Sequence, residues 1–143
     1  MSSMEDQVRR RLGERGVRYT PHRRAVVTAL ARADGPRSAA ELRDDIGDSI
    51  PVSSLYRSLG VLERAGVLTP HLGSRDVIRY ELAEWISGHH HHLVCIDCGS
   101  VEDVTVPSPV ESEVRSLVAG IAGGSFTPLA HTLEIEGRCA RCA

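Results

Sequence analysis

The chain has 143 residues, of which 41% are hydrophobic and 3% aromatic, enough for one ordinary domain or two small ones with an aliphatic core. No apolar run approaches the roughly 18 residues of a membrane-spanning helix, and the N-terminal MSSMEDQVRR lacks the apolar segment of a signal peptide. These features exclude a membrane protein and predict a cytoplasmic one with no membrane partner.

The charge of the chain is divided unevenly between its two halves. The net charge is -2, but residues 1–80 carry 14 basic and 10 acidic residues, whereas residues 81–143 carry 3 and 9. Every basic residue is arginine, whose forked guanidinium suits phosphate and guanine edges. The asymmetry predicts two domains with different partners; chance clustering of solvated charge is the alternative.

Four helices and a hairpin are predicted in the first half. A short amphipathic helix contains Met4 and ends near Gly13 or Gly16, and a second begins at Pro21. The second is capped by Thr20, the third by a Ser38/Glu41 capping box, and the fourth begins at Ser53 or Ser54 and ends at Gly66. The runs VLTPHL and VIRYEL then read as two strands of a hairpin joined by GSRD. This order is that of a winged helix-turn-helix domain, in which the last helix before the hairpin enters the major groove. A small helical domain with an ordinary charged surface is the alternative.

A small α+β region is predicted after the linker AEWISG. The runs HHHHLVC, VEDVTV and LAHTLEIEG read as strands, and PVESEVRSLVAGIAGG reads as an amphipathic helix. We therefore expect a winged-helix domain over residues 1–82, a hinge over 83–88 and a second domain over 89–143.

The four cysteines form two Cys-x-x-Cys pairs, Cys95/Cys98 and Cys139/Cys142. In a chain without signs of secretion, two such pairs are typical of a tetrahedral zinc–thiolate site. We expect one structural Zn²⁺ there.

The four consecutive histidines predict two sites. Along a strand, side chains alternate between faces, so His89 and His91 point one way and His90 and His92 the other. Further ligands must come from elsewhere, and His131 is a candidate. It shares a face with Leu129, Leu133 and Ile135 in the predicted last strand and should point toward the interior.

With these motifs in place, the chain resembles the ferric uptake regulator family of bacterial metal-sensing repressors over nearly its whole length. The resemblance is carried by TPHRRAV, SSLYRSLGVLERAGVL, RYEL, HHHHLVCIDCGSVEDV and HTLEIEGRCARC. It implies a C-terminal dimerisation domain and homodimers that bind palindromic operator DNA when metal is bound.

The resemblance also implies three metal sites. A structural zinc would lie on the four cysteines, a site within the dimerisation domain on His89, His91, Glu111 and His131, and a sensing site at the hinge on Glu81, His90 and His92. A histidine that completes the hinge site in many members has no counterpart in GPRSAAEL, and His71 in the wing is the candidate in its place. Glu111 has a second interpretation, because Ser108 and Glu111 are spaced as a capping box.

Five residues are candidates for DNA contact. Tyr56 could pack against a thymine methyl group and Arg57 could bond a guanine edge, with Ser54 on the same polar face of the fourth helix. Arg18 and Arg23 suit phosphate or minor-groove contacts.

The sequence thus predicts a non-enzymatic, metal-responsive transcriptional repressor, with no small-molecule substrate beyond metal ions. The regulatory metal stays open among Fe²⁺, Zn²⁺, Mn²⁺ and Ni²⁺, since nitrogen and carboxylate ligands suit all of them. The alternatives are a zinc-dependent hydrolase and a zinc interaction module that does not bind DNA. Against the hydrolase, the sequence has no His-Glu-x-x-His motif and no glycine-rich phosphate loop.

Overall fold

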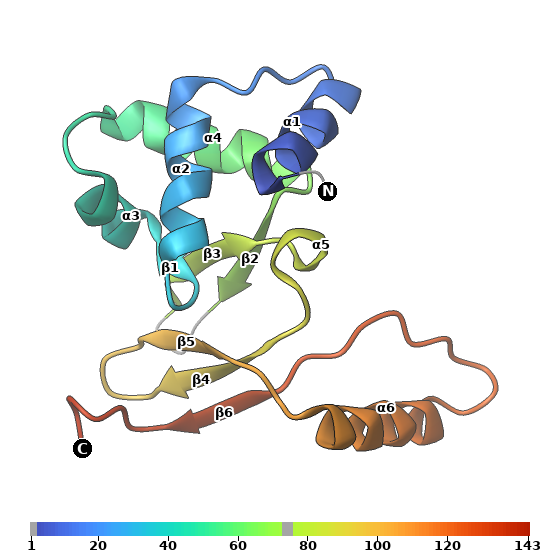
Figure 1. Ribbon diagram of the computed structural model, residues 1–143. Helices are drawn as coiled ribbons and strands as arrows, with labels where there is room; N and C mark the ends of the chain where they lie inside the picture. Colours follow the sequence, from blue (N-terminus) through green and yellow to red (C-terminus); the bar gives the residue numbers. More distant parts are fainter. Residues whose placement is uncertain (1–2, 73–75) are drawn as a thin grey trace.

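The computed structural model describes residues 3–72 and 76–143 and has two structural regions (Figure 1). The first region contains α1 (Met4–Glu14), α2 (Pro21–Arg32), β1 (Arg37–Ser38), α3 (Ala39–Ile46), α4 (Val52–Arg64), β2 (Leu68–Leu72) and β3 (Ile78–Leu82). Its strands form an antiparallel sheet in the order β1-β3-β2. Helices followed by two antiparallel strands confirm the expected winged helix-turn-helix, and residues 73–75 of the predicted GSRD turn lie outside the described residues.

The helix starts follow from local side-chain chemistry, with one exception. Thr20 caps α2 by accepting a hydrogen bond from the Arg23 amide at 3.4 Å, and Ser38 and Glu41 form the expected capping box of α3. The prediction that α4 begins at Ser53 or Ser54 is wrong: it begins at Val52 after Pro51, without a side-chain cap. Proline at this position fixes the backbone dihedral that a helix entry requires, so no serine is needed.

The first region has a continuous aliphatic core. Its members come from all four helices and both hairpin strands, and include Val8, Leu12, Val26, Val27, Leu30, Leu42, Leu55, Leu59, Leu62, Val67, Leu68 and Leu82. Ser58 of α4 is also buried against this core. The core fixes α4 with Tyr56 and Arg57 on its exposed side.

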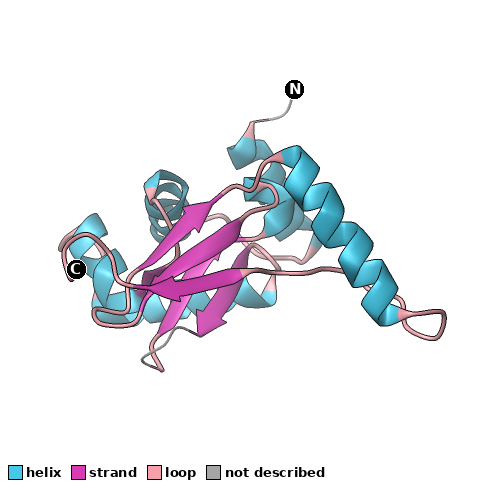
Figure 2. Cartoon of the chain, turned by 90° about the horizontal axis from the view of Figure 1, so that it is seen from below, coloured by secondary structure: helices cyan, strands magenta, loops and turns pink. Residues whose placement is uncertain are grey.

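The second region is smaller and much less buried. It contains β4 (His91–Cys95), β5 (Val101–Val104), α6 (Ser108–Ala122) and β6 (Glu134–Gly137), and its sheet has the order β5-β4-β6. Strand β4 pairs antiparallel with β5 and parallel with β6. Helix α6 reaches out to one side of the strands rather than covering them (Figure 2).

Two expectations about this region are wrong for a single chain. The last strand begins at Glu134 and not near Leu129, and the supposed inward residues Leu129 and Ile135 are 94% and 61% exposed. On α6, Leu117 and Ile121 are 62% and 77% exposed. The apolar stripes that the periodicity predicts are present, but this chain alone does not bury them.

The predicted linker is partly a helix fixed to the first region. It forms α5 (Glu84–Ser87), and the indole Nε1 of Trp85 donates to the Gly66 carbonyl at 2.8 Å. The Arg11 guanidinium lies 4.4 Å from the Trp85 ring centroid. Gly88 follows at φ 84°, a conformation that favours glycine. The change of direction between the two regions is therefore concentrated at Gly88.

A second contact joins the regions through backbone atoms. The Asp103 amide in β5 donates to the Asp34 carbonyl at 2.8 Å. A Cβ atom placed on Gly35 would lie 2.3 Å from the Val101 carbonyl oxygen, so only glycine fits.

No described helix is both long and apolar enough to cross a membrane.

Replacing Gly35 with alanine should push the α2–β1 loop away from β5, because the nearest atoms belong to backbone that cannot rotate aside. We expect Gly35→Ala to lower the free energy of unfolding by about 1 to 3 kcal/mol and to speed hydrogen exchange at the Asp103 amide. Gly13→Ala is the control, since no atom lies within 4 Å of the position that its added Cβ would take. Equal stability and unchanged exchange in both variants would contradict this packing.

Candidate metal centres

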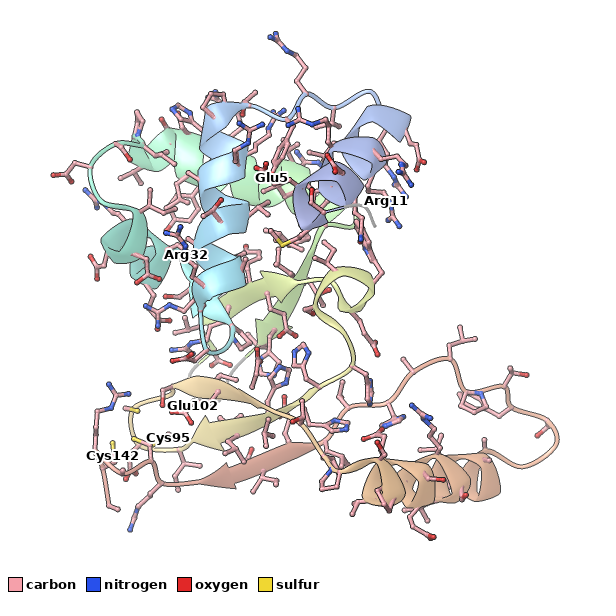
Figure 3. All side chains as sticks on the ribbon, in the orientation of Figure 1. Glu5, Arg11, Arg32, Cys95, Glu102 and Cys142 are labelled. Atoms are coloured by element: carbon pink, nitrogen blue, oxygen red, sulfur yellow. The ribbon has the colours of Figure 1, made fainter. Side chains whose placement is uncertain are left out.

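The four cysteines lie together at one end of the second sheet. Cys95 ends β4, and Cys98, Cys139 and Cys142 belong to turns beside it; Figure 3 labels Cys95 and Cys142 at this end. All four Sγ atoms lie within 4.8 Å of one another, and no disulfide joins them. Four thiol sulfurs converging in this way match the donor set of a closed structural zinc site.

Local polar groups already distinguish the four thiols. The backbone amides of Cys98 and then Cys139 donate toward Cys95 Sγ and lower the pKa of that thiol to about 6. The side chain of Cys139 raises the pKa of Cys142 to about 12. Backbone amides aimed at a sulfur stabilise the thiolate, which is the form that binds metal.

A second cluster joins β4 to α6. His89, His91, Glu111 and His131 contribute one possible ligand atom each, all within 4.8 Å. Nε2 of His89 lies 2.8 Å from Oε1 of Glu111, Nε2 of His91 lies 2.8 Å from Oε2, and His131 Nε2 also contacts Oε1.

The electrostatics of this cluster centre on Glu111. Its hydrogen bonds to His91, His131 and His89 outweigh burial and lower the pKa of its carboxyl group to about 2. Nδ1 of His91 accepts from the Leu133 amide at 3.0 Å, so Nε2 carries the proton in the neutral ring. One carboxylate and three imidazoles that converge in this way provide a four-donor cation site.

The capping interpretation of Glu111 is wrong. Helix α6 starts at Ser108 after Pro107, and no side chain caps it. Ser108 is therefore already inside the helix, where its hydroxyl cannot act as the cap. Glu111 is 7% exposed and its carboxylate faces the histidines instead.

A third cluster spans the hinge. It consists of Glu81 in β3, His90 and His92 at the start of β4, and Asp103 in β5. Oε2 of Glu81 lies 2.8 Å from Nε2 of His90 and 3.1 Å from Nε2 of His92, and Oδ1 of Asp103 lies 3.4 Å from both nitrogens. One carboxylate of the first region thus meets two imidazoles and a carboxylate of the second.

Hydrogen bonds within the hinge cluster outweigh burial, raising the pKa of His90 and His92 and lowering that of Glu81, which favours the ionised forms of these three groups. Burial acts to lower the pKa of His92, but hydrogen bonds to Asp103 and Glu81 outweigh it and raise the pKa to about 9. Burial acts to raise the pKa of Glu81, and the hydrogen bonds from His92 and His90 lower it nonetheless. The protein compensates the buried carboxylate with imidazole protons, which a metal cation can replace.

Asp103 was missed from the sequence, and His71 lies beside the hinge cluster in contact with His92, so its role as a hinge ligand stays a prediction. Asp103 stands directly across from His92 in the β4–β5 pairing, a position that only the strand register reveals. His71 does not share the cluster of Glu81, His90 and Asp103; its Nε2 lies 2.5 Å from Oε1 of Glu134, and its ring stacks edge-on against His92 at 4.8 Å.

The DNA-contact candidates lie on α4, in the loop between α1 and α2, and at the start of α2. Tyr56 is 60% exposed on α4, Arg57 and Arg18 are exposed, and Ser54 is half-buried. Arg23, also half-buried, donates from Nη1 to the Arg18 carbonyl at 2.6 Å. This bond ties the α1–α2 loop to the start of α2.

Several known proteins are similar in sequence to this chain over most of its length. The zinc uptake regulation protein of Mycobacterium tuberculosis is 36% identical over 132 residues, covering 89% of this chain and 95% of that protein. The ferric uptake regulation protein of Escherichia coli K12 is 30% identical over 133 residues, covering 90% and 86%. The peroxide operon regulator of Bacillus subtilis is 28% identical over 135 residues, covering 92% and 88%.

Solved structures share the fold. The ferric uptake regulator of Helicobacter pylori, described as having three functional metal binding sites, superposes with a TM-score of 0.74 at 23% identity over 99% of this chain and 94% of that one. The Vibrio cholerae regulator gives a TM-score of 0.69 at 27% identity over 92% and 98%. The model of the ferric uptake regulator family matches residues 14–135. The chain therefore belongs to the ferric uptake regulator family, whose members are metal-responsive transcriptional regulators.

Proposed function

We propose that this protein is a repressor that binds palindromic operator DNA as a homodimer when a divalent metal occupies the hinge cluster, and so controls genes of metal homeostasis. The observation that carries the proposal is the position of Glu81. It lies on the last strand of the first region, yet its carboxylate contacts His90 and His92 of the second. We divide the chain accordingly into residues 1–82, 83–88 and 89–143.

Glu81, His90, His92 and Asp103 would hold the regulatory metal. A divalent cation bound there supplies positive charge and directed bonds that draw donors from both regions toward one point. Two carboxylates and two neutral imidazoles leave a formal charge of -2 in a half-buried site, and without a cation the imidazoles must be protonated to balance it. The angle between the regions then shifts toward the state with assembled ligands, as a change of population.

The homodimer is proposed to form through the second region. Exposed apolar residues gather on α6, β6 and the loop between them, and include Val110, Leu117, Ile121, Phe126, Leu129, Leu133 and Ile135. A patch of this kind on an otherwise polar small domain marks a protein interface. Two recognition helices must be about 34 to 36 Å apart to enter successive major grooves, so the angle at each hinge decides DNA affinity.

The four cysteines are proposed to hold a structural Zn²⁺, and the Glu111 cluster a second metal that ties α6 to β4. The regulatory metal is Fe²⁺, Zn²⁺, Mn²⁺ or Ni²⁺, because a mixed imidazole–carboxylate set binds all four. The 36% identity to a zinc uptake regulation protein makes Zn²⁺ the first to test. A role at operator DNA implies a cytoplasmic protein.

Membership of a family of transcriptional regulators decides against the zinc hydrolase. No feature of the described residues favours the interaction module that does not bind DNA. Duplex binding that is lost on adding a chelator and restored by metal would test the repressor directly; metal-independent binding, or none, would contradict it.

Cys95→Ser should release one Zn²⁺ per protomer and lower stability strongly, because a closed structural site contributes folding free energy directly. Metal analysis and thermal unfolding measure both effects. Ile96→Ser, an exposed neighbour in the same turn, should keep the zinc. If Cys95→Ser retains its full zinc content and a normal dimer, the four-cysteine site is wrong.

Substitutions on the two faces of the histidine run should have different effects. Replacing both His90 and His92 with alanine should abolish metal-dependent DNA binding, because Glu81 then loses its partners across the hinge. Replacing His89 and His91 should mainly reduce metal content and stability. Titrations of DNA and metal distinguish the two outcomes, and identical losses in both double variants would indicate one shared site.

Arg57→Ala should weaken operator binding by about 1 to 3 kcal/mol and relax the preference at one base pair per half-site. Arg18→Ala should instead weaken binding to all sequences and flatten its salt dependence, since phosphate contacts carry no sequence information. Both variants should bind metal normally. If Arg57→Ala keeps full affinity and base preference in the metal-loaded dimer, α4 does not read the operator.

A further inference from the structure

A fourth group of possible ligands connects the wing to the last strand. It consists of His71 in β2, His92 in β4 and Glu134 in β6, whose candidate ligand atoms all lie within 4.8 Å of one another. Nε2 of His71 is 2.5 Å from Oε1 of Glu134, and the rings of His71 and His92 are 4.8 Å apart at 65°. We call this group the wing cluster.

Strand pairing explains why His92 takes part in two groups. Asp103 of β5 and Glu134 of β6 are the pairing partners of His92 on its two sides, so the three residues form a row across the sheet. Residues in register on neighbouring strands project from the same face. The imidazole of His92 therefore stands between a carboxylate of the hinge cluster and a carboxylate of the wing cluster.

Two ring nitrogens in the wing cluster have no hydrogen-bond partner among the described residues. They are Nδ1 of His71 and Nδ1 of His92, both buried. The His92 side chain is only 4% exposed, and its Nε2 is already engaged with Glu81 and Asp103. Leaving a buried polar atom without a hydrogen-bond partner costs stability, so proteins rarely do so without a purpose.

We propose that His71, His92 and Glu134 form a second interdomain divalent-cation site that shares the His92 imidazole with the hinge cluster. The hinge cation takes Nε2 of His92, and the wing cation takes the free Nδ1. A donor set of two imidazoles and one carboxylate suits Zn²⁺ or another late first-row divalent ion, with water in the open position. When both cations bind, the imidazolium ring of His92 gives up both of its N–H protons to solvent.

A simple ion pair between His71 and Glu134 explains less. It accounts for the 2.5 Å contact but leaves Nδ1 of the buried His92 ring unpaired. It also gives no reason for His71 to lie against His92, a residue of the other region. A cation satisfies His92 Nδ1 and brings both rings and the carboxylate to one centre.

The site would fasten the wing to β6, next to the exposed apolar residues proposed for dimer formation. The hinge cluster holds β3 by Glu81, and the wing cluster would hold β2 by His71. Both hairpin strands would then be attached to the second region. Two attachment points restrain the rotation of the hairpin relative to the second region as well as the distance between them. The inference goes beyond the proposed function and does not require DNA binding.

Counting bound cobalt tests the proposal. The full-length protein, with its cysteine-bound zinc retained, is dialysed against Co²⁺ and the bound Co²⁺ per protomer is measured. Glu134→Gln, an exposed and isosteric change, and His71→Ala should each bind one equivalent fewer than the unaltered protein. Glu136→Gln, two residues along β6 and outside every cluster, should bind the same number.

Combination with a hinge variant shows whether the two cations are separate. Glu134→Gln should remove one equivalent whether Glu81 is intact or replaced by glutamine. The proposal is overturned if Glu134→Gln or His71→Ala leaves the cobalt count unchanged, which would make the contact an ion pair only. It is equally overturned if Glu134→Gln has no effect in the Glu81→Gln background, since one cation would then serve both clusters. Failure of Glu81→Gln to lose cobalt would instead count against the proposed function.

Discussion

The alternation of side chains along β4 is the constraint on which the metal chemistry of this protein depends. Neighbouring residues of a strand face opposite ways. His91 therefore contacts Glu111 of α6, whereas His92 contacts Glu81 across the hinge. A single strand thus connects the interior of the second region to the first region, and its last residue, Cys95, contributes to the cysteine cluster. A change in the register of β4 by one residue would exchange the two faces and dismantle both histidine clusters at once.

The hinge is more sharply defined than a flexible linker would be. Trp85 fixes the linker to the first region, and the Asp34–Asp103 backbone bond joins the two regions without any metal. The ionised carboxylate of Glu81 adds a polar contact between the regions. The strength of this contact depends on whether imidazole protons or a metal cation balance the negative charge of Glu81. A sensor of this design needs only a small difference in free energy between two arrangements of the regions, because a modest difference in metal affinity then shifts their populations.

Features encoded by local spacing were predictable from the sequence, whereas those set by long-range pairing were not. The caps at Thr20 and Ser38, the cysteine pairs and the histidine alternation depend on residues within a few positions of each other. Asp103 and Glu134 join His92 only through strand pairing, which periodicity does not specify. The start of β6 was misplaced for a related reason: its apolar pattern continues before Glu134, but no described strand of this chain pairs with it there.

The distance between the two α4 helices in the dimer tests the central claim most directly. A spin label introduced at position 63 through a non-natural amino acid avoids the four cysteines, and pulsed electron resonance then gives the distribution of label distances. Metal loading should convert a broad distribution into a narrow one compatible with recognition helices about 34 to 36 Å apart, and Glu81→Gln should keep it broad. An identical distribution with and without metal would contradict the account, because the hinge cluster would then not set the geometry of DNA binding.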